Sequence, residues 1–352
     1  PLGRNEEWGE WIRGAEILAR EIHDEARLSN VFNYLSSVHW IHDETRKAID
    51  LGLEALKLAR KTGHSSCQVA TMLHLGIYFF TSGDYPRQIQ YHQDVRRRLT
   101  GESAFQQHGL TCFPGAWSRS NLVLGMAELG QFDQLEEIGQ EALEIAEQVE
   151  NAFTLIITYT FIGMAWLRRG EVDAALPHLE KAHKMCRFSK VRFVHPYTAG
   201  SLGYAYLLAG EPSRALAVLE EGTRPGNLDG GVWTVHPLTV LADAYRTAGD
   251  IAMATDAAVR ALALAGKGEE RGFEAWAKFV MAGINLDAGQ PAQAAEWYRW
   301  ALQQATDLSM RPLVAHCHKG LGNVHLGLGS EEKARLEIKQ ALDIYRSLGM
   351  SC

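Results

Sequence analysis

A cluster of potential metal ligands lies near the C-terminus of the sequence. Cys317 stands between His316 and His318, and His325 follows seven residues after His318. Thiolate and imidazole are ligands that zinc prefers. Successive residues of a helix point about 100° apart, so three neighbours do not converge on one ion, and the wider step to His325 is too long for a two-ligand clip. We therefore predict no metal site here or elsewhere in the chain.

Patterns for catalysis and cofactor binding are also missing from the sequence. There is no P-loop, and no glycine-rich dinucleotide fingerprint that follows a strand-like segment. The five cysteines are odd in number and scattered, a usage typical of the reducing cytoplasm. We expect a cytoplasmic, non-enzymatic protein that needs no cofactor.

The charge balance limits the kinds of partner. A net charge of -7 argues against general nucleic-acid binding, which needs a basic surface. The run from Arg96 to Arg98 is a local exception. Cations at the end of a helix are favourable in themselves, and contact with a phosphate or an acidic partner is the alternative. No apolar run approaches the roughly 18 residues of a membrane-spanning helix, so we expect no membrane insertion.

Turns that begin with glycine recur almost evenly along the chain and indicate what must position any functional residue. They stand at Gly83, Gly130, Gly170, Gly210, Gly249, Gly289 and Gly329. The spacing is 40 residues except for one interval of 47 and one of 39, and Asp43 takes the same place 40 residues before the first glycine. A repeat of this length is typical of a solenoid of helical hairpins.

Small residues recur at fixed distances from these turns. Five residues after the turn they are Ala48, Ala175, Ala215, Ala254, Ala294 and Ala334. Seven residues before it they are Gly76, Gly163, Gly203, Ala242, Ala282 and Gly322. Small side chains let two antiparallel helices approach closely, and large neighbours fill the space beside them. The pattern predicts an all-α solenoid of about eight helix-turn-helix repeats, each of which buries its apolar face on its neighbours.

This pattern resembles the tetratricopeptide repeat in a long, 40-residue form. The clearest copies are residues 202–215 and 321–334, and the resemblance extends over about residues 30–350. It implies a right-handed superhelix in which the first helix of each repeat lines a concave groove that binds ligands. Four positions in the second and third repeats carry large residues where small ones belong: Gln88, Val95, Val123 and Leu135.

The ends and the interruptions of the pattern divide the chain. Residues 1–5 resemble the remnant of a cleaved tag, and residues 6–29 hold an opening helix, expected at 6–27, that serves as a half repeat or a cap. The solenoid at 30–350 contains a loop insertion at 100–117, which accounts for the 47-residue interval. Residues 224–231 form a second irregular stretch and are a candidate hinge.

Counting back from the turns assigns residues of the first helices to the concave face. The set mixes aromatic, amide and charged side chains: His74, Asn121, Tyr197, Tyr204, His236, Asp243, Arg246, Trp276, His316, Lys319 and Asn323. Aromatic side chains anchor an extended peptide or a helix, and polar groups fix its register. The set is richer in His and Tyr than in Lys and Arg, so it fits poorly the class of groove that clamps a peptide carboxylate with stacked Lys, Arg and Asn side chains. These residues are our candidates for binding a protein or a peptide.

The C-terminal segments 310–322 and 345–350 resemble the tetratricopeptide arm of bacterial multidomain signalling proteins. In such proteins a nucleotide cyclase or a DNA-binding domain precedes a signal-transduction ATPase of the STAND type, and the arm follows. The resemblance implies a regulatory arm whose partner is a separate protein or peptide, or another domain of the parent protein. Two alternatives stay open: a small-molecule inducer held among aromatic groove residues, and self-association through the opening helix.

Overall fold

The computed structural model describes residues 5–189, 191, 193–224 and 232–350. The predicted tag remnant, apart from Asn5, lies outside the described residues, and so does the candidate hinge from residue 225 onward. The described residues contain helices and no strand. This confirms the predicted all-α class.

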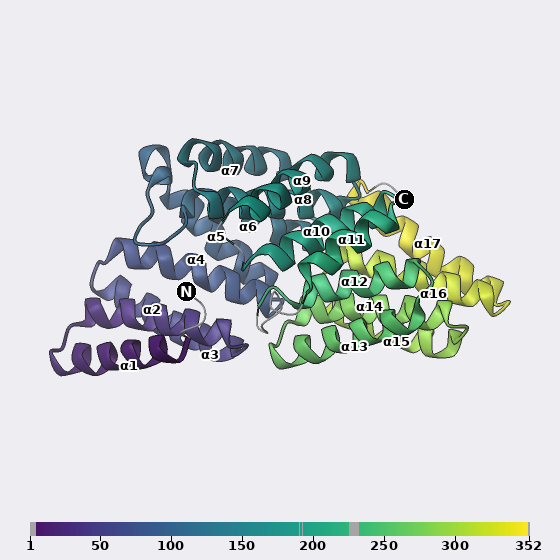
Figure 1. Cartoon of the computed structure of the whole chain (residues 1–352), viewed down its shortest axis with the longest axis horizontal. Helices are drawn as coiled ribbons and strands as arrows, with labels where there is room; N and C mark the ends of the chain where they lie inside the picture. The colour runs from purple at the N-terminus through teal and green to yellow at the C-terminus, as the bar shows by residue number, and fades with distance from the viewer. Residues whose placement is uncertain (1–4, 190, 192, 225–231, 351–352) are drawn as a thin grey trace.

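Along the described residues the chain forms seventeen α-helices and one 3-10 helix. Figure 1 labels the α-helices in chain order. Their bounds are α1 Asn5–Glu21, α2 Glu25–Ile41, α3 Thr45–Lys61, α4 Ser65–Thr81, α5 Tyr85–Arg98, η2 Gly101–Phe105, α6 Pro114–Glu128, α7 Leu135–Val149, α8 Ala152–Arg169, α9 Val172–Phe188, α10 His195–Leu208, α11 Pro212–Gly222, α12 Val235–Thr247, α13 Ile251–Lys267, α14 Arg271–Asp287, α15 Pro291–Asp307, α16 Arg311–Gly327 and α17 Glu331–Leu348. The eight hairpins from α2–α3 to α16–α17 are the predicted repeats, and α1 packs on α2 beside the first of them.

One left-handed residue stands at most of the connections between helices. The predicted turns have it at glycine, as at Gly170 with φ 93°, and Asp43 takes the glycine's place with φ 63°. Several turns between repeats use other residues for the same conformation, namely His23, Glu150, Glu269 and Ser309. Because these residues are not glycine, the sequence pattern revealed every second turn rather than every turn.

The opening segment differs from the single helix predicted at residues 6–27. Its chain turns at His23, whose φ is 55°, and a new helix begins after Asp24. The Asp24 carboxylate accepts a hydrogen bond of 2.9 Å from the backbone N–H of Arg27, which caps the start of α2. The segment therefore consists of α1 and the first turn of α2.

The large side chains of α5 in the second repeat are accommodated by one glycine on each of the two helices that face it. Gln88 of α5 donates a 2.7 Å hydrogen bond to the carbonyl of Asn121 on α6. A Cβ atom added at Gly125 would lie 1.7 Å from Oε1 of Gln88, and one added at Gly76 would lie 2.4 Å from Nε2 of His92. The large side chains of α5 thus occupy space that glycine leaves free, and the hairpin packing continues through this region.

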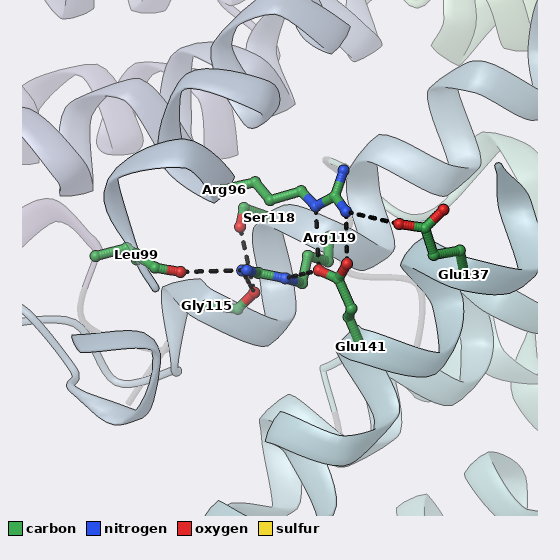
Figure 2. Close-up of polar contacts among 7 residues, drawn as sticks. All are labelled: Arg96, Leu99, Gly115, Ser118, Arg119, Glu137 and Glu141. Atoms are coloured by element: carbon green, nitrogen blue, oxygen red, sulfur yellow. Dashed lines mark hydrogen bonds and ion pairs between the residues drawn. The ribbon is translucent and has the colours of Figure 1, made fainter. Parts of the chain in front are cut away.

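The insertion at 100–117 is a folded connection, because η2 lies within it and α6 already begins at Pro114. Figure 2 shows how its two ends are joined at Arg119 of α6, which is almost fully buried. Its guanidinium donates to the carbonyls of Leu99 at 3.2 Å and Gly115 at 2.9 Å, and to the Glu141 carboxylate at 2.7 Å. Both ends of the insertion are therefore held by one arginine.

Arg96 belongs to the same network and is not simply a solvated helix end. Its Nε atom donates a 3.1 Å hydrogen bond to Glu141, and Glu137 lies 3.5 Å from its guanidinium (Figure 2). These carboxylates raise the pKa of Arg96, and the hydrogen bonds from Arg96 lower that of Glu141. Arg97 is paired with Asp94 on its own helix. In this run of three arginines, two are thus balanced by acidic partners.

The later repeats lie against the earlier ones along a seam, where α14 contacts α4 and α16 contacts α6. Thr45 donates a 2.7 Å hydrogen bond to the carbonyl of Gly268, and Lys267 lies 2.9 Å from the carboxylate of Asp43. These pairs are 223 and 224 residues apart in the sequence. The solenoid thus meets its own beginning after between five and six 40-residue repeats (Figure 1).

Gly272 of α14 is required by this seam, because a Cβ atom there would lie 2.0 Å from Oη of Tyr85 on α5. We expect Gly272→Ala to lower the free energy of unfolding by roughly 2 kcal/mol through overpacking. Gly266→Ala is the matched control on α13, since a Cβ atom there meets nothing within 4 Å. It should be neutral or stabilising by up to about 1 kcal/mol.

Urea unfolding of the two alanine variants measures this difference. Tyr85→Phe in the Gly272→Ala background removes the clashing oxygen and should restore part of the lost stability. Equal stabilities for the two alanine variants would show that the two sides of the seam do not meet at Gly272.

Candidate binding site inside the superhelix

The first helices of the repeats line an interior that side chains largely fill. All fifteen residues of α6 are buried. By contrast, only Ala215, Leu219 and Gly222 are buried in the outer helix α11. The predicted concave groove, whose closure the sequence left undecided, is therefore a narrow interior, because the seam brings the repeats on its two sides together.

An aromatic pocket lies in this interior, and we call it the axial pocket. Its walls include the rings of Trp40, Phe161, Tyr197, Trp233 and Phe273, which come from α2, α8, α10, the segment before α12, and α14. The Tyr197 and Trp233 rings lie 4.9 Å apart in an edge-to-face arrangement, and Phe161 stacks on Trp233 at 6.0 Å. The free volume is about 30 Å³, enough for one water-sized group.

Glu270 places a carboxyl group at the wall of the axial pocket. It is 4% exposed and stands at the N-cap position of α14, yet its side chain makes no capping hydrogen bond. The described residues give this carboxyl no hydrogen bond or ion pair. Burial, with the nearby charge of Asp43, raises the pKa of Glu270 to about 8. The group is therefore mostly protonated at neutral pH.

His236 and Tyr197 contribute the other titratable groups of the axial pocket. Burial, and then the charge of Arg168, lowers the pKa of His236 to about 3, so its imidazole is neutral at physiological pH. Its Nε2 atom lies 3.4 Å from the hydroxyl of Ser201. Burial raises the pKa of Tyr197, which stays a neutral phenol. The pocket thus holds no cation of its own.

A buried ion pair lies next to the axial pocket. Arg168 at the end of α8 donates a 2.7 Å hydrogen bond to the Glu128 carboxylate at the end of α6, and both side chains are 3% exposed. Trp276 of α14 donates to the same carboxylate at 3.2 Å, and the guanidinium lies 4.1 Å from a Trp276 ring centroid. We call these three residues the central clasp. They join repeats that lie on opposite sides of the seam.

The structure brings six of the eleven predicted binding residues together around the interior. Asn121, Tyr197 and His236 line the axial pocket. A second cavity of about 30 Å³ is lined by Tyr204, Asp243 and Trp276, and again by His236 and Arg168. Two neighbouring hollows therefore share the imidazole of His236.

The other five predicted residues lie outside these two hollows. His74 lies 3.0 Å from Asn33, and burial lowers its pKa to about 4. Arg246 pairs with Asp243 at 2.8 Å and with Asp287 at 2.6 Å. His316 bonds to the Tyr345 hydroxyl at 2.7 Å, and its pKa is lowered to about 4 by burial. Lys319 and Asn323 are exposed on α16, three and seven residues after His316.

Sequence reasoning missed Glu270, Trp233 and the charged pair of the central clasp. Glu270 follows a turn whose left-handed residue is glutamate, so the repeat register gave no mark there. A signal did exist for the clasp. Glu128 and Arg168 each stand two residues before a turn glycine, so opposite charges occupy the same position in adjacent repeats.

No group of three or more His, Cys, Asp or Glu residues in the described part of the chain is placed to hold a metal ion. Cys317 is fully buried, and burial raises the pKa of its thiol. No helix among the described residues combines the length and apolar character needed to cross a bilayer.

The comparisons with known proteins agree with this architecture. Residues 162–181 and 196–221 match the family model described as the tetratricopeptide repeat. A Rap protein complexed with Competence and Sporulation Factor is similar in structure over 99% of this chain and 98% of its own, with a TM-score of 0.68 and 15% identity. None of the curated proteins matches the sequence.

Two further solved structures share the fold. The Rap conjugation gene regulator of plasmid pLS20, in complex with a Phr peptide, covers 98% of this chain and 94% of its own, with a TM-score of 0.63 and 14% identity. A signal transduction ATPase with numerous domains and a tetratricopeptide repeat sensor, from Pyrococcus horikoshii, covers 92% of this chain and 50% of its own, with a TM-score of 0.51 and 12% identity. Residues 162–181 and 196–221 thus match the tetratricopeptide repeat, and the described part of the chain folds as an all-helical solenoid.

Proposed function

We propose that this chain is a non-catalytic regulatory arm that binds a peptide, or an extended segment of a protein, on the inner surface formed by its first helices. The observation that carries the proposal is the unsatisfied polar group among aromatic rings in the interior. The Glu270 carboxyl makes no hydrogen bond within the described residues. The rings of Tyr197 and Trp233 line the same pocket and offer apolar faces. Aromatic anchors with a few polar groups are typical of peptide recognition.

The sizes of the interior hollows favour single side chains of a peptide over an enclosed small molecule. The axial pocket and its neighbour each have a free volume of about 30 Å³. Sites that enclose a drug-sized ligand are usually about 300 Å³ or larger. Two Rap proteins of the same fold are solved with a peptide or with Competence and Sporulation Factor, which adds support from architecture. We also propose that the arm is part of a larger signalling protein in the bacterial cytoplasm.

The test is a selection of binders from a display library of random twelve-residue peptides, followed by affinity measurements on the full chain. Asp243→Asn removes an inner-surface charge, and Asp256→Asn makes the same change at an exposed position on the outer helix α13. We expect Asp243→Asn to weaken binding of the selected peptides about tenfold or more, equivalent to about 1.4 kcal/mol. Asp256→Asn should leave their affinities unchanged.

Competition between selected peptides provides the second readout. Peptides that share the inner surface should displace one another, and their affinities should fall together in the inner-surface variant. A library that yields no binder, or only binders that respond to Asp256→Asn and not to Asp243→Asn, would contradict the proposal.

A further inference from the structure

The carboxyl group of Glu270 is a buried polar group that makes no hydrogen bond within the described residues. An N-cap carboxylate usually accepts a hydrogen bond from the first turn of its own helix, and Glu270 makes none. Burying an ionisable group without a partner is unfavourable, and Glu270 is 4% exposed. Helix α14 does not use this side chain as a cap, so the carboxyl group is available to a ligand.

The surroundings of Glu270 are suited to a cation. Aromatic faces attract cations through their quadrupole, and the attraction is stronger away from water. Six aromatic rings of Trp, Tyr and Phe residues line the axial pocket with Glu270. Asp43 lies close enough to raise the pKa of Glu270. His236 is held in its neutral form, so the pocket itself supplies no positive charge to balance the carboxyl.

We infer that the axial pocket binds an organic ammonium group, which donates hydrogen bonds to the Glu270 carboxylate and faces the aromatic rings. The free volume of about 30 Å³ fits a primary ammonium and is small for a guanidinium or a trimethylated nitrogen. The ammonium comes from a lysine side chain of the bound peptide or from a free alkylamine. The lysine source rests on the proposed function, whereas the pocket itself does not.

Binding of this kind moves one proton. At pH 7 the Glu270 carboxyl is mostly protonated, because its pKa is about 8. An ammonium ion that binds to the carboxylate displaces that proton to solvent, and the ammonium keeps all of its own. The other titratable groups near Glu270 are Asp43 in the turn after α2, Lys267 of α13 paired with it, Tyr197 of α10 and His236 of α12. An ammonium ion already carries all of its protons, so its binding takes no proton from any of these groups.

Calorimetric titration of the full chain with n-butylammonium chloride at pH 7 tests the pocket without any peptide. Two buffers of different ionisation enthalpy report the protons released. We expect about one proton released by the wild-type chain, and a loss of affinity of at least tenfold in Glu270→Gln. Glu269→Gln makes the same change one residue earlier at an exposed position and should leave both quantities unchanged. Neutral n-butanol and potassium chloride should not bind.

A peptide from the library selection then identifies the source of the ammonium. A lysine-containing binder should lose at least tenfold in affinity when norleucine replaces the lysine, and should lose nothing further in Glu270→Gln. If only n-butylammonium shows the Glu270 dependence, the ligand is a free amine, and absence of any peptide binder would then reject the proposed function while the pocket stands.

The inference is overturned if n-butylammonium does not bind, or binds equally to the wild-type chain and to Glu270→Gln. Glu270→Gln keeps the shape of the side chain, so a folded variant is expected. The preference of the wild-type chain for n-butylammonium over n-butanol gives a second measurement that does not depend on any variant. No preference in that comparison also rejects the pocket.

Discussion

Glu270→Gln is expected to be more stable than the wild-type chain at pH 9, by up to roughly 5 kcal/mol, and nearly equal to it at pH 4. The pKa of Glu270 rises from an ordinary value near 4.5 to about 8 on folding. Each pH unit between the two values corresponds to about 1.4 kcal/mol. The protonated form is favoured in the folded chain, so stability is complete below the unfolded pKa and is lost as the pH rises through 8. The amide of glutamine does not ionise and escapes this loss.

Urea unfolding measures the free energy of unfolding of Glu270→Gln relative to that of the wild-type chain, once at pH 4 and once at pH 9. The effect is the change in this relative stability between the two pH values. Glu269→Gln is the control, because Glu269 is exposed. Its ion pair with Arg46, at 3.8 Å, is open to solvent and contributes little to stability. The stability of Glu269→Gln relative to the wild-type chain should be the same at both pH values to within about 0.5 kcal/mol. A stability gain for Glu270→Gln that is the same at both pH values would show that Glu270 ionises normally in the folded chain.

Arg168→Met is expected to lower the free energy of unfolding by about 3 to 5 kcal/mol. The substitution leaves the Glu128 carboxylate buried without its cation and removes a guanidinium 4.1 Å from a Trp276 ring centroid. Burial by itself lowers the pKa of Arg168, but the charge of Glu128 reverses the direction and raises it. The neighbouring carboxylate therefore keeps Arg168 charged inside the protein.

The double variant Arg168→Met with Glu128→Leu separates the ion pair from the site it occupies. Replacing both charges by apolar groups of similar size is often neutral or stabilising, so the double variant should recover most of the stability lost by Arg168→Met. Arg214→Met is the surface control, since Arg214 forms exposed pairs with Glu180 and Glu211. Equal losses for Arg168→Met and Arg214→Met would mean that the central clasp is open to water.

The repeat architecture was predictable because local residues determine it. Gly83 and Gly170 end helices in a left-handed conformation that favours glycine. Asp43 could be placed among them by spacing alone, since aspartate also tolerates this conformation. The turns at Glu150 and Glu269 escaped notice because nothing in their residue type marks them. Their positions follow only once the length of each helix is known.

Closure of the interior was not predictable from the sequence. A small rotation between neighbouring repeats accumulates along a solenoid, so the meeting of Tyr85 with Gly272 depends on the sum over many interfaces. Helical register grouped Tyr197 and His236 on the inner surface, and both line the axial pocket. The register does not give the distance between this surface and the opposite wall of the interior. Glu270 and Trp233 line the axial pocket because that distance is short.

The seam also changes how this molecule carries load and information. In an open solenoid each repeat contacts only its neighbours, so a force on one end is spread gradually over all the repeats, as in a spring. Here Lys267 and Asp43 bridge residues 224 positions apart, and the chain becomes a closed loop rather than a spring. A displacement of the sixth repeat therefore acts directly on the first repeat through this bridge, as well as along the repeats between them.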